Sequence, residues 1–388
     1  MRVIHHTAKY LPPSQTFIFD LTEYLDKRLD ESLIVTHGLM GNADKTNIPI
    51  KQVSLTGLPV WRRKIQNYIS KLRGRAPNLH FGHWLKTISE RKPDVVHCHF
   101  GNSAYFHQKF LDAHNLSIPT LVSFHGYDVF LANKIAPDYI TTIQTLAKAK
   151  TLFTCPSNYL ARHAIKVFSL PESQVRVVPN GFNPELFQLR TNKALDSNQI
   201  VITHVGRFEN WKGQEDLIRA ISELDKVGVS NVYLQLIGDG EAFNSMKNLA
   251  QELQISDRVR FLGLVSHQKV ASTLRKTDLY VHPSSTGKNG QAETFGVAIL
   301  EAIAIGLPVI MTNAGGMKEI IPSPHPQFAQ VVQEKSPKAL AESIQQWLHH
   351  QEDYSEQDFM AFRDTVLGLN NMERTGQLIQ KLYNEVSQ

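Results

Sequence analysis

The chain has 388 residues, of which 42% are apolar and 20% are charged. This length corresponds to two or three domains, and the composition is that of a globular protein, which excludes disordered and fibrous chains. The longest apolar stretch, residues 296–308, contains Glu301 and is shorter than the roughly 18–20 residues of a membrane span. Two cysteines and an amino end without an apolar leader predict a cytoplasmic protein.

The net charge of +5 is unevenly distributed along the chain. Residues 1–185 carry 22 basic and 13 acidic side chains, whereas the remainder carries 19 basic and 23 acidic ones. The first part is therefore +9 and the second −4. A basic half is compatible with nucleic acid, an anionic membrane surface or phosphorylated substrates, and charge alone does not choose among them.

Short β-rich apolar runs alternate with longer helix-like stretches, which predicts an α/β fold with parallel sheets covered by helices on both faces. The expected strands of the first half are 3–5, 33–37, 95–99, 120–124, 152–155 and 175–178. Those of the second half are 200–205, 232–237, 259–262, 279–282, 309–312 and 329–332. Turn-forming residues at 179–184 indicate a domain crossing. We therefore expect domains at 1–184 and 185–369, with a last helix in 370–388 that returns to the first domain.

Residues 61–75 contain six basic side chains, no acidic one, and apolar residues at helical spacing. This pattern predicts a basic amphipathic helix, either packed on a sheet with a solvated basic face or docked on anionic lipid headgroups. Nucleic acid is disfavoured as a partner because no nucleic-acid-binding motif accompanies the charge.

Residues 287–309 begin as a polar, glycine-rich loop and become helix-like near Phe295. The first N–H groups of such a helix suit a phosphate. Glu293 lies in the loop and Glu301 follows eight residues later, close to two helical turns. Glu301 is surrounded by apolar residues, where a carboxylate needs a partner such as a sugar or ribose hydroxyl. Taken alone, a loop acid and a helix acid of this kind are more often structural than functional.

The segment 204–213 follows another expected strand and contains Arg207 and Lys212. Ligands of open α/β sheets bind at such strand ends, where two cations can neutralise a diphosphate. The alternative is a pair of solvated loop cations. The Gly238-Asp239-Gly240 turn is a weaker sign, because tight turns often use glycine.

Several short motifs follow one another along residues 200–320: Gly-Arg-Phe-x-x-x-Lys-Gly, Ile-Gly-Asp-Gly-Glu, Phe-Leu-Gly, and Glu-x-Phe-Gly with a second Glu eight residues after the first. Their order and spacing resemble the retaining glycosyltransferases of family 4. In the amino half, residues 11–17, 94–101 and 123–128 are similar to the acceptor-side half of that family, nearest to enzymes that build exopolysaccharide and lipopolysaccharide. The sequence departs from the family where a Gly-Gly pair after the first strand is replaced by a Ser-Gln-Thr loop.

The resemblance implies a GT-B fold, in which two facing Rossmann-like domains border a deep cleft. It implies retaining transfer of a sugar from a UDP- or GDP-sugar to a saccharide or lipid-linked saccharide, without a divalent metal or other cofactor. By the same resemblance, Arg207 and Lys212 bind the diphosphate, Glu301 the ribose and Glu293 the donor sugar, while His125 is the active-site histidine. Further donor contacts are implied for Gly206, Gly240, Leu264, Val265, Thr294, Phe295 and Gly296. Acceptor-side contacts are implied for Ser14, Gln15, Thr16, His99 and Asp128.

Several other functions remain as alternatives at this stage. A nucleotide-sugar epimerase shares the architecture but leaves the ordered motifs unexplained, and a non-catalytic basic membrane-binding protein accounts for residues 61–75 alone. A dinucleotide oxidoreductase is disfavoured because no Gly-x-Gly-x-x-Gly follows the first strand. His97 and His99 share one face of an expected strand, but no further ligand cluster at fixed spacing supports zinc, so we expect no metal.

Overall fold

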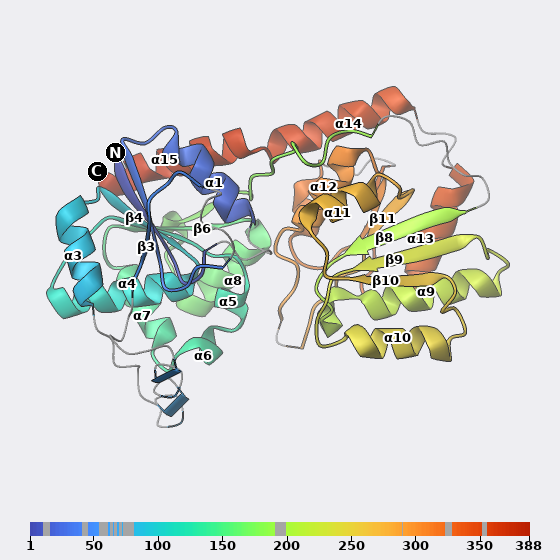
Figure 1. Cartoon of the computed structure of the whole chain (residues 1–388), viewed down its shortest axis with the longest axis horizontal. Coiled ribbons are helices and arrows are strands. Elements are labelled where there is room, and N and C mark those ends of the chain that lie inside the picture. Colours follow the sequence, from blue (N-terminus) through green and yellow to red (C-terminus); the bar gives the residue numbers. More distant parts are fainter. Residues whose placement is uncertain are drawn as a thin grey trace. The chain divides into compact units, whose positions relative to one another are not determined.

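The computed structural model of the chain describes residues 1–10, 16–40, 46–53, 81–190, 199–288, 290–322, 328–350 and 355–388, together with residues 61, 62, 65, 68, 69 and 72. It divides into two units, each built around one sheet (Figure 1). Unit 1 consists of Met1–Gly181 and Met372–Gln388, and unit 2 of Phe182–Asn371. The chain thus passes between the units within the predicted turn segment 179–184 and again at residues 371–372.

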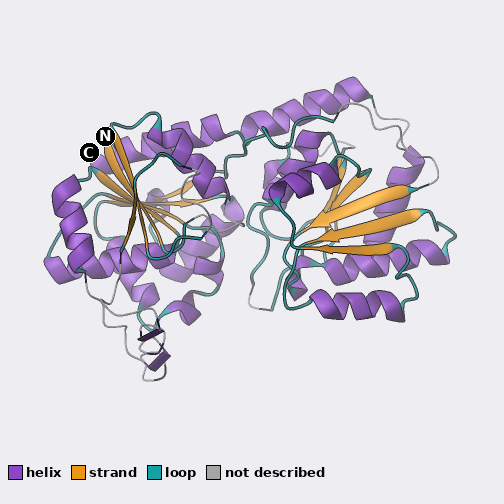
Figure 2. Ribbon diagram, in the orientation of Figure 1, coloured by secondary structure: helices purple, strands orange, loops and turns teal. Residues whose placement is uncertain are grey.

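Unit 1 contains a seven-stranded parallel sheet in the order β3-β2-β1-β4-β5-β6-β7 (Figure 2). Its strands are β1 (Arg2–Thr7), β2 (Glu31–Thr36), β3 (Ile50–Gln52), β4 (Val95–His99), β5 (Thr120–Ser123), β6 (Thr151–Cys155) and β7 (Val175–Val177). Its helices are α1 (Thr16–Asp26), α3 (Gly82–Arg91), α4 (Gly101–His114), α5 (Tyr127–Phe130), α6 (Ala132–Ile135), α7 (Tyr139–Leu146), α8 (Asn158–Phe168) and α15 (Met372–Ser387), with the short turn η2 (Glu172–Gln174).

Unit 2 contains a six-stranded parallel sheet in the order β10-β9-β8-β11-β12-β13. Its strands are β8 (Ile200–Val205), β9 (Val232–Ile237), β10 (Val259–Gly263), β11 (Leu279–His282), β12 (Val309–Thr312) and β13 (Ala329–Val332). Its helices are α9 (Gln214–Lys226), α10 (Phe243–Glu252), α11 (His267–Leu274), α12 (Val297–Ile305), α13 (Pro337–His350) and α14 (Glu356–Leu369), with the turns η3 (Asn210–Lys212) and η4 (Met317–Ile320).

Helices cover both faces of each sheet, because strands buried on two sides need apolar partners on each. In unit 2, α9, α10 and α13 pack on one face and α11, α12 and α14 on the other. In unit 1, α1 and α15 share one face and α3, α4, α7 and α8 the opposite one. These two doubly wound, Rossmann-like units confirm the predicted α/β fold class.

The strand order reverses direction between β1 and β4 in unit 1 and between β8 and β11 in unit 2. Ligands of open α/β sheets bind at such switch points, outside the carboxyl ends of the strands. Two differences from expectation stand out. The short edge strand β3 was not predicted. In the segment 61–75, the apolar residues that the structure describes are helical but 41–70% exposed, so these side chains do not pack on a sheet.

Candidate active site

The switch point of unit 2 brings Lys212 and Glu293 together. Lys212 ends the turn η3 after β8, and Glu293 lies in the loop between β11 and α12. Their side chains are 11% and 16% exposed, and Lys212 Nζ lies 2.5 Å from Glu293 Oε2. His282 Nε2 lies 3.4 Å from the same carboxylate oxygen. Burial opposes ionisation of Glu293, but the Lys212 ammonium and His282 outweigh it and hold the pKa of the carboxyl well below its usual range.

A close backbone approach allows this pair to form. Gly213 has a φ of +75°, and a Cβ there would lie 1.9 Å from the carbonyl oxygen of Pro283. Only glycine permits both the left-handed backbone and the contact between the β8 and β11 loops. The Lys212 ammonium also lies 4.3 Å from the centre of the Trp211 ring, which supports the cation from its other side.

Arg207 lies in the same loop as Lys212 but is more accessible. Its side chain is 65% exposed and pairs with Glu209 at 2.6 Å. The Gln214 side chain donates a hydrogen bond of 2.9 Å to the Arg207 carbonyl oxygen and thereby fixes the backbone of the loop. Arg207 thus combines a fixed backbone with an exposed guanidinium that a ligand can reach. Lys212 in the same loop is instead buried and paired with Glu293.

Glu301 has a different partner from Glu293. It lies on α12, is 5% exposed, and its Oε1 lies 3.3 Å from His267 Nε2 at the start of α11. The two carboxylates, eight residues apart, therefore have separate partners. Glu293 pairs with Lys212 and His282, whereas Glu301 pairs with His267. Of the segment between them, Thr294 and Phe295 are buried, and Gly296 is the left-handed residue at which α12 begins. The first turn of α12 directs the positive end of its dipole toward this loop.

The remaining predicted donor contacts behave differently from one another. Leu264 is 74% exposed after β10, and Val265 beside it is half-buried. The Gly206 carbonyl oxygen lies 2.0 Å from the position that a Cβ on Gly238 would occupy. Gly240 has its N–H bonded to Asp239 Oδ1 at 2.8 Å, and a Cβ there would lie 2.4 Å from the Phe208 carbonyl oxygen. The geometry thus explains Gly240 as a turn residue that packs against the neighbouring loop.

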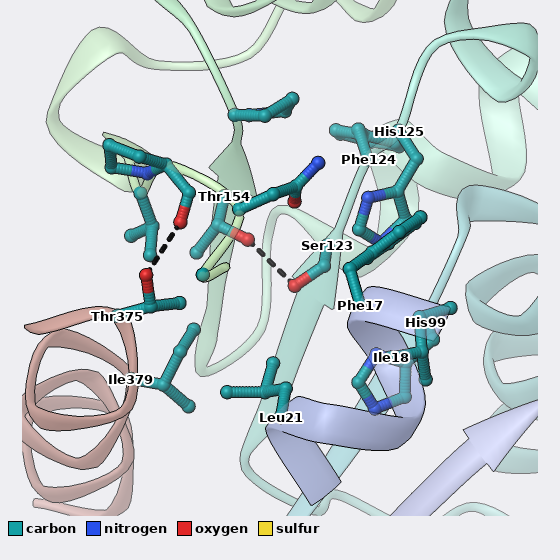
Figure 3. A pocket seen from close by; sticks show the side chains of 15 residues that line it. Phe17, Ile18, Leu21, His99, Ser123, Phe124, His125, Thr154, Thr375 and Ile379 are labelled. Carbon is teal, nitrogen blue, oxygen red and sulfur yellow. Dashed lines mark hydrogen bonds between the residues drawn. The ribbon is translucent and has the colours of Figure 1, made fainter. Parts of the chain in front are cut away.

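A pocket in unit 1 lies at the carboxyl ends of β4 to β7 (Figure 3). His99, Ser123, His125 and Thr154 line it together with apolar side chains of α1 and α15. Ser123 Oγ and Thr154 Oγ1 are hydrogen bonded at 2.7 Å, as the dashed line in Figure 3 shows. The ring nitrogens of His125 are buried, and burial lowers the pKa of this histidine to about 3. The pocket therefore presents neutral polar groups on an apolar wall.

The predicted acceptor-side residues are distributed over this region. His99 is the last residue of β4 and lines the pocket, and Thr16 is the first residue of α1. Asp128 does not line the pocket, because it is fully buried in the first turn of α5. Ser14 and Gln15 lie outside the described residues.

In the described part of the chain, His5, His97 and His99 form the one group of side chains spaced closely enough to be considered for a metal. Each of these three rings has at least one nitrogen in a hydrogen bond. His97 contacts Tyr383 and Ser123, each at 2.8 Å, and His5 Nδ1 lies 3.2 Å from His99 Nε2. His5 Nε2 and His99 Nδ1 are buried without such a partner. The bonds of His97 join α15 to Ser123, which lines the pocket.

Sequence reasoning did not find three residues that complete the site: His267 and His282 as carboxylate partners, and Gln214 as support for the Arg207 loop. It named Asp128 but not its buried position. His282 ends an expected strand, which was the one available signal. The others depend on contacts between distant segments.

Two doubly wound parallel sheets in separate units are the architecture of the GT-B fold, and the second carries charged side chains at its switch point. Residues 14–186 match the family model described as Glycosyltransferase Family 4, and residues 187–359 match that described as Glycosyl transferases group 1. The chain belongs to this family of glycosyltransferases and is related to its exopolysaccharide enzymes, which confirms the predicted relationship.

The chain is similar to several known proteins. It is 23% identical to a putative colanic acid biosynthesis glycosyltransferase, WcaL of Salmonella typhimurium, over 94% of this chain and 95% of that one. It is 28% identical to an uncharacterized glycosyltransferase of Methanocaldococcus jannaschii over 59% of this chain, and the match spans only 60% of that relative. Among solved structures, Anabaena HepE in complex with UDP-glucose superposes with a TM-score of 0.75 at 20% identity, covering 99% of this chain and 100% of that one.

The segment 61–75 lies away from these sites in sequence and is described only in part. Among its described residues, Trp61, Ile65, Tyr68, Ile69 and Leu72 are exposed apolar side chains in helical backbone, and the Arg62 guanidinium lies 4.9 Å from the Trp61 ring centre. Across the described ranges, no helix has both the length and the apolarity of a membrane span.

Proposed function

We propose that this glycosyltransferase transfers a sugar from a UDP- or GDP-sugar to a saccharide or lipid-linked saccharide with retention at the anomeric carbon, and that it needs no divalent metal. The observation that carries the proposal is the buried Lys212–Glu293 pair at the switch point of unit 2. A buried pair is costly to maintain for stability alone, since each ion loses its hydration. A diphosphate and the hydroxyls of a sugar are the ligands that such a cation and anion would bind.

The leaving group explains the cations. When a nucleoside diphosphate departs, negative charge develops on its phosphate oxygens. Lys212, Arg207 and the amino end of α12 supply fixed positive charge at that position, which is the contribution that a metal ion makes in other transferases. Glu293, kept ionised by Lys212, accepts hydrogen bonds from donor-sugar hydroxyls. This division of roles agrees with a chain that has no Asp-x-Asp metal motif.

Two further groups complete the proposal. Glu301 accepts hydrogen bonds from the ribose hydroxyls, for which the buried carboxylate and its partner His267 are suited. In unit 1, His125 remains neutral and hydrogen bonds the sugar that is transferred. His99 and Thr16 contact the acceptor, together with Ser14 and Gln15 from the sequence resemblance.

The experiment is a donor panel with excess EDTA. Purified protein is incubated with UDP- and GDP-sugars and acceptor saccharides, and nucleoside diphosphate and product anomer are measured. UDP-sugars are tested first because HepE binds UDP-glucose, and polysaccharide fragments are used as acceptors because WcaL is a putative colanic acid enzyme. Diphosphate release with a retained anomer supports the proposal. Release that stops with EDTA, an inverted anomer, or free epimer without transfer contradicts it.

We further propose that residues 61–75 dock on an anionic membrane surface, where a lipid-linked acceptor would be found. The described apolar side chains are exposed, and the segment carries six basic residues and no acid. Apolar insertion combined with basic attraction is the pattern of an interfacial helix. A helix on a soluble surface would bury this face instead.

Flotation with vesicles that contain anionic lipid tests this surface. Two variants are expected to lose binding: one with Arg62, Arg63 and Lys64 replaced by Glu, and one that combines Ile65→Ser with Leu72→Ser. The control combines Val227→Ser with Leu369→Ser, which removes exposed apolar side chains of unit 2 and should leave binding unchanged. Equal flotation of all four proteins, or equal binding to neutral vesicles, would show that this segment is not a lipid-docking surface.

A further inference from the structure

The Asp128 carboxylate in unit 1 collects backbone amides from two loops. It is fully buried and accepts hydrogen bonds from the N–H groups of Gly101 and Gly126 at 2.8 Å and of His125 at 3.1 Å. Gly101 follows β4, whereas His125 and Gly126 follow β5. One side chain therefore joins the two strand ends that carry His99 and His125 into the pocket.

This carboxylate is an unusual choice for a purely structural turn. A buried acid costs free energy unless its charge is compensated. In the described residues, its partners are backbone amides and not a cation. Burial raises the pKa of Asp128 to about 6, although the three amides favour the ionised form. A carboxylate accepts hydrogen bonds on both of its oxygens, as Asp128 does here, whereas the neutral amide of the same size accepts on one oxygen only.

The amides that Asp128 binds control the surroundings of the His125 ring. Phe100 has a φ of +72°, a left-handed conformation that is unfavourable for a bulky residue and has to be held by its surroundings. The bond from Gly101 N–H to Asp128 fixes the peptide that follows Phe100. The Phe100 ring then lies 4.5 Å from the His125 ring, and Phe17 lies 4.9 Å from it on α1.

Packing leaves little room for an alternative arrangement. A Cβ on Gly101 would lie 2.0 Å from the Tyr139 hydroxyl oxygen. That hydroxyl donates a hydrogen bond of 3.0 Å to the Asp128 carbonyl oxygen. Both the side chain and the backbone of Asp128 are therefore bonded to the structure that carries Phe100 and His125.

We propose that Asp128 is a positioning residue for His125, holding the histidine backbone and its aromatic neighbour Phe100 in one fixed arrangement. The proposal rests on the role of His125 given under the proposed function. It also replaces the sequence-based expectation that Asp128 contacts the acceptor, because the carboxylate faces buried amides and not the pocket.

Asp128→Asn tests the proposal with little change in volume. The substitution replaces one accepting oxygen by an amide nitrogen, which cannot accept a hydrogen bond from the backbone N–H groups. We expect kcat to fall by about 10–100-fold, the cost of a small misplacement of a reacting group. The KM for the donor should stay within about threefold, because unit 2 is proposed to hold the nucleotide and its diphosphate. The matched control is Asp138→Asn, an acid of the same unit that pairs with Lys109 and Tyr105 at the start of α7. Its kcat should be unchanged.

A double-mutant cycle with His125→Ala separates positioning from a general structural role. If Asp128 acts through His125, Asp128→Asn causes no further loss of kcat in the His125→Ala background. An additive loss overturns the proposal, as does an unchanged kcat for Asp128→Asn alone.

Amide hydrogen exchange of the wild-type protein provides a test that needs neither activity nor a folded variant. The amides of Gly101, His125 and Gly126 should exchange slowly and, if Asp128→Asn folds, lose protection together. Rapid exchange in the wild type refutes the hydrogen-bonded arrangement. If His125→Ala retains full kcat while these amides remain protected, the proposed role of His125 has failed and Asp128 is not a positioning residue for the reaction.

Discussion

Mild acid is expected to unfold unit 1 because this unit buries an unusual number of neutral imidazoles. Among the described residues of unit 1, six histidines have buried imidazoles: His5, His6, His97, His99, His107 and His125. Burial lowers the pKa of His5, His107 and His125 to about 3 and that of the other three well below the ordinary value of 6.5. At pH 5.5 the folded state keeps these rings neutral, whereas the unfolded chain protonates them.

The direction follows from linkage between protonation and folding. A folded-state pKa below the unfolded value gives stability that is complete above pH 6.5 and is lost progressively as the pH falls from there toward the folded pKa. At pH 5.5, each of the six histidines favours the unfolded chain by about 1 kcal/mol, which amounts to several kcal/mol in total. Asp128 opposes this trend, since its raised pKa lets the folded state bind a proton below about pH 6. Its contribution at pH 5.5 is about 1 kcal/mol, so the histidines dominate.

A net loss of several kcal/mol is comparable to the whole stability of a typical domain, about 5–15 kcal/mol. Among the described residues of unit 2, His204 and His282 have a pKa lowered by burial, so this unit should lose less stability over the same range. Denaturant unfolding at several pH values, with peptide-resolved hydrogen exchange to separate the units, measures both. The free energy of unfolding of unit 1 should fall as the pH is lowered below 6. Its slope against pH should approach a net uptake of about five protons on unfolding, six by the histidines less one held by Asp128 in the folded state.

Matched variants isolate one histidine. His107 lies within α4 beside Trp84, whereas His83 on α3 is exposed. His107→Leu should reduce the slope of unfolding free energy against pH by about 1.4 kcal/mol per pH unit, and His83→Leu should leave it unchanged. If the stability of unit 1 stays flat between pH 7.5 and 5.5, or if the two variants give equal slopes, the folded protein protonates its imidazoles and the reasoning is wrong.

Three further changes test the site and the fold. Lys212→Ala should weaken nucleoside diphosphate binding by about 1–3 kcal/mol, as expected for a charge-assisted contact, and unchanged affinity by calorimetry would remove Lys212 from the diphosphate site. Glu301→Gln should weaken donor binding while far-UV circular dichroism stays that of the wild type; normal donor affinity would refute the ribose contact. Truncation after residue 371 removes α15 and uncovers the apolar face of unit 1, so the melting temperature should fall and activity should be lost; a fully active truncated enzyme would contradict this.

The strands were largely predictable because buried parallel strands are continuous apolar runs. The predicted bounds of β4, β8, β9, β11, β12 and β13 match the structure, and the other predicted strands differ at their ends by one or two residues. β3 escaped prediction because its three residues, Ile-Lys-Gln, form a short half-exposed edge strand with no apolar pattern. In residues 61–75, the spacing predicted the helical backbone of the described positions, but spacing alone could not say whether their apolar side chains are buried or exposed.

The site was less predictable than the fold because its partners are distant in sequence. Lys212 and Glu293 were each identified, but their ion pair joins residues 81 positions apart and depends on the contact at Gly213. Glu301 was expected to need a hydroxyl partner, and the sequence did not indicate His267, whose Nε2 lies 3.3 Å from its Oε1. Asp128 stands in a His-Gly-x-Asp context that suggested a ligand contact, and only the tertiary structure reveals that its oxygens bind backbone amides.

At neither site do the local charges follow the net charge of that half of the chain. Unit 2 comes from the net acidic half, yet Arg207 and Lys212 both follow β8, at the switch point between β8 and β11. The proposed diphosphate site would need this local positive charge whatever the net charge of the unit. Unit 1 comes from the basic half, yet the pocket at its strand ends is lined by neutral histidines and hydroxyls. Burial removes charge from that pocket, since desolvation disfavours the imidazolium. The described residues that line this pocket include no Lys or Arg, and the sequence segment 61–75 holds the densest cluster of basic residues in the first half of the chain.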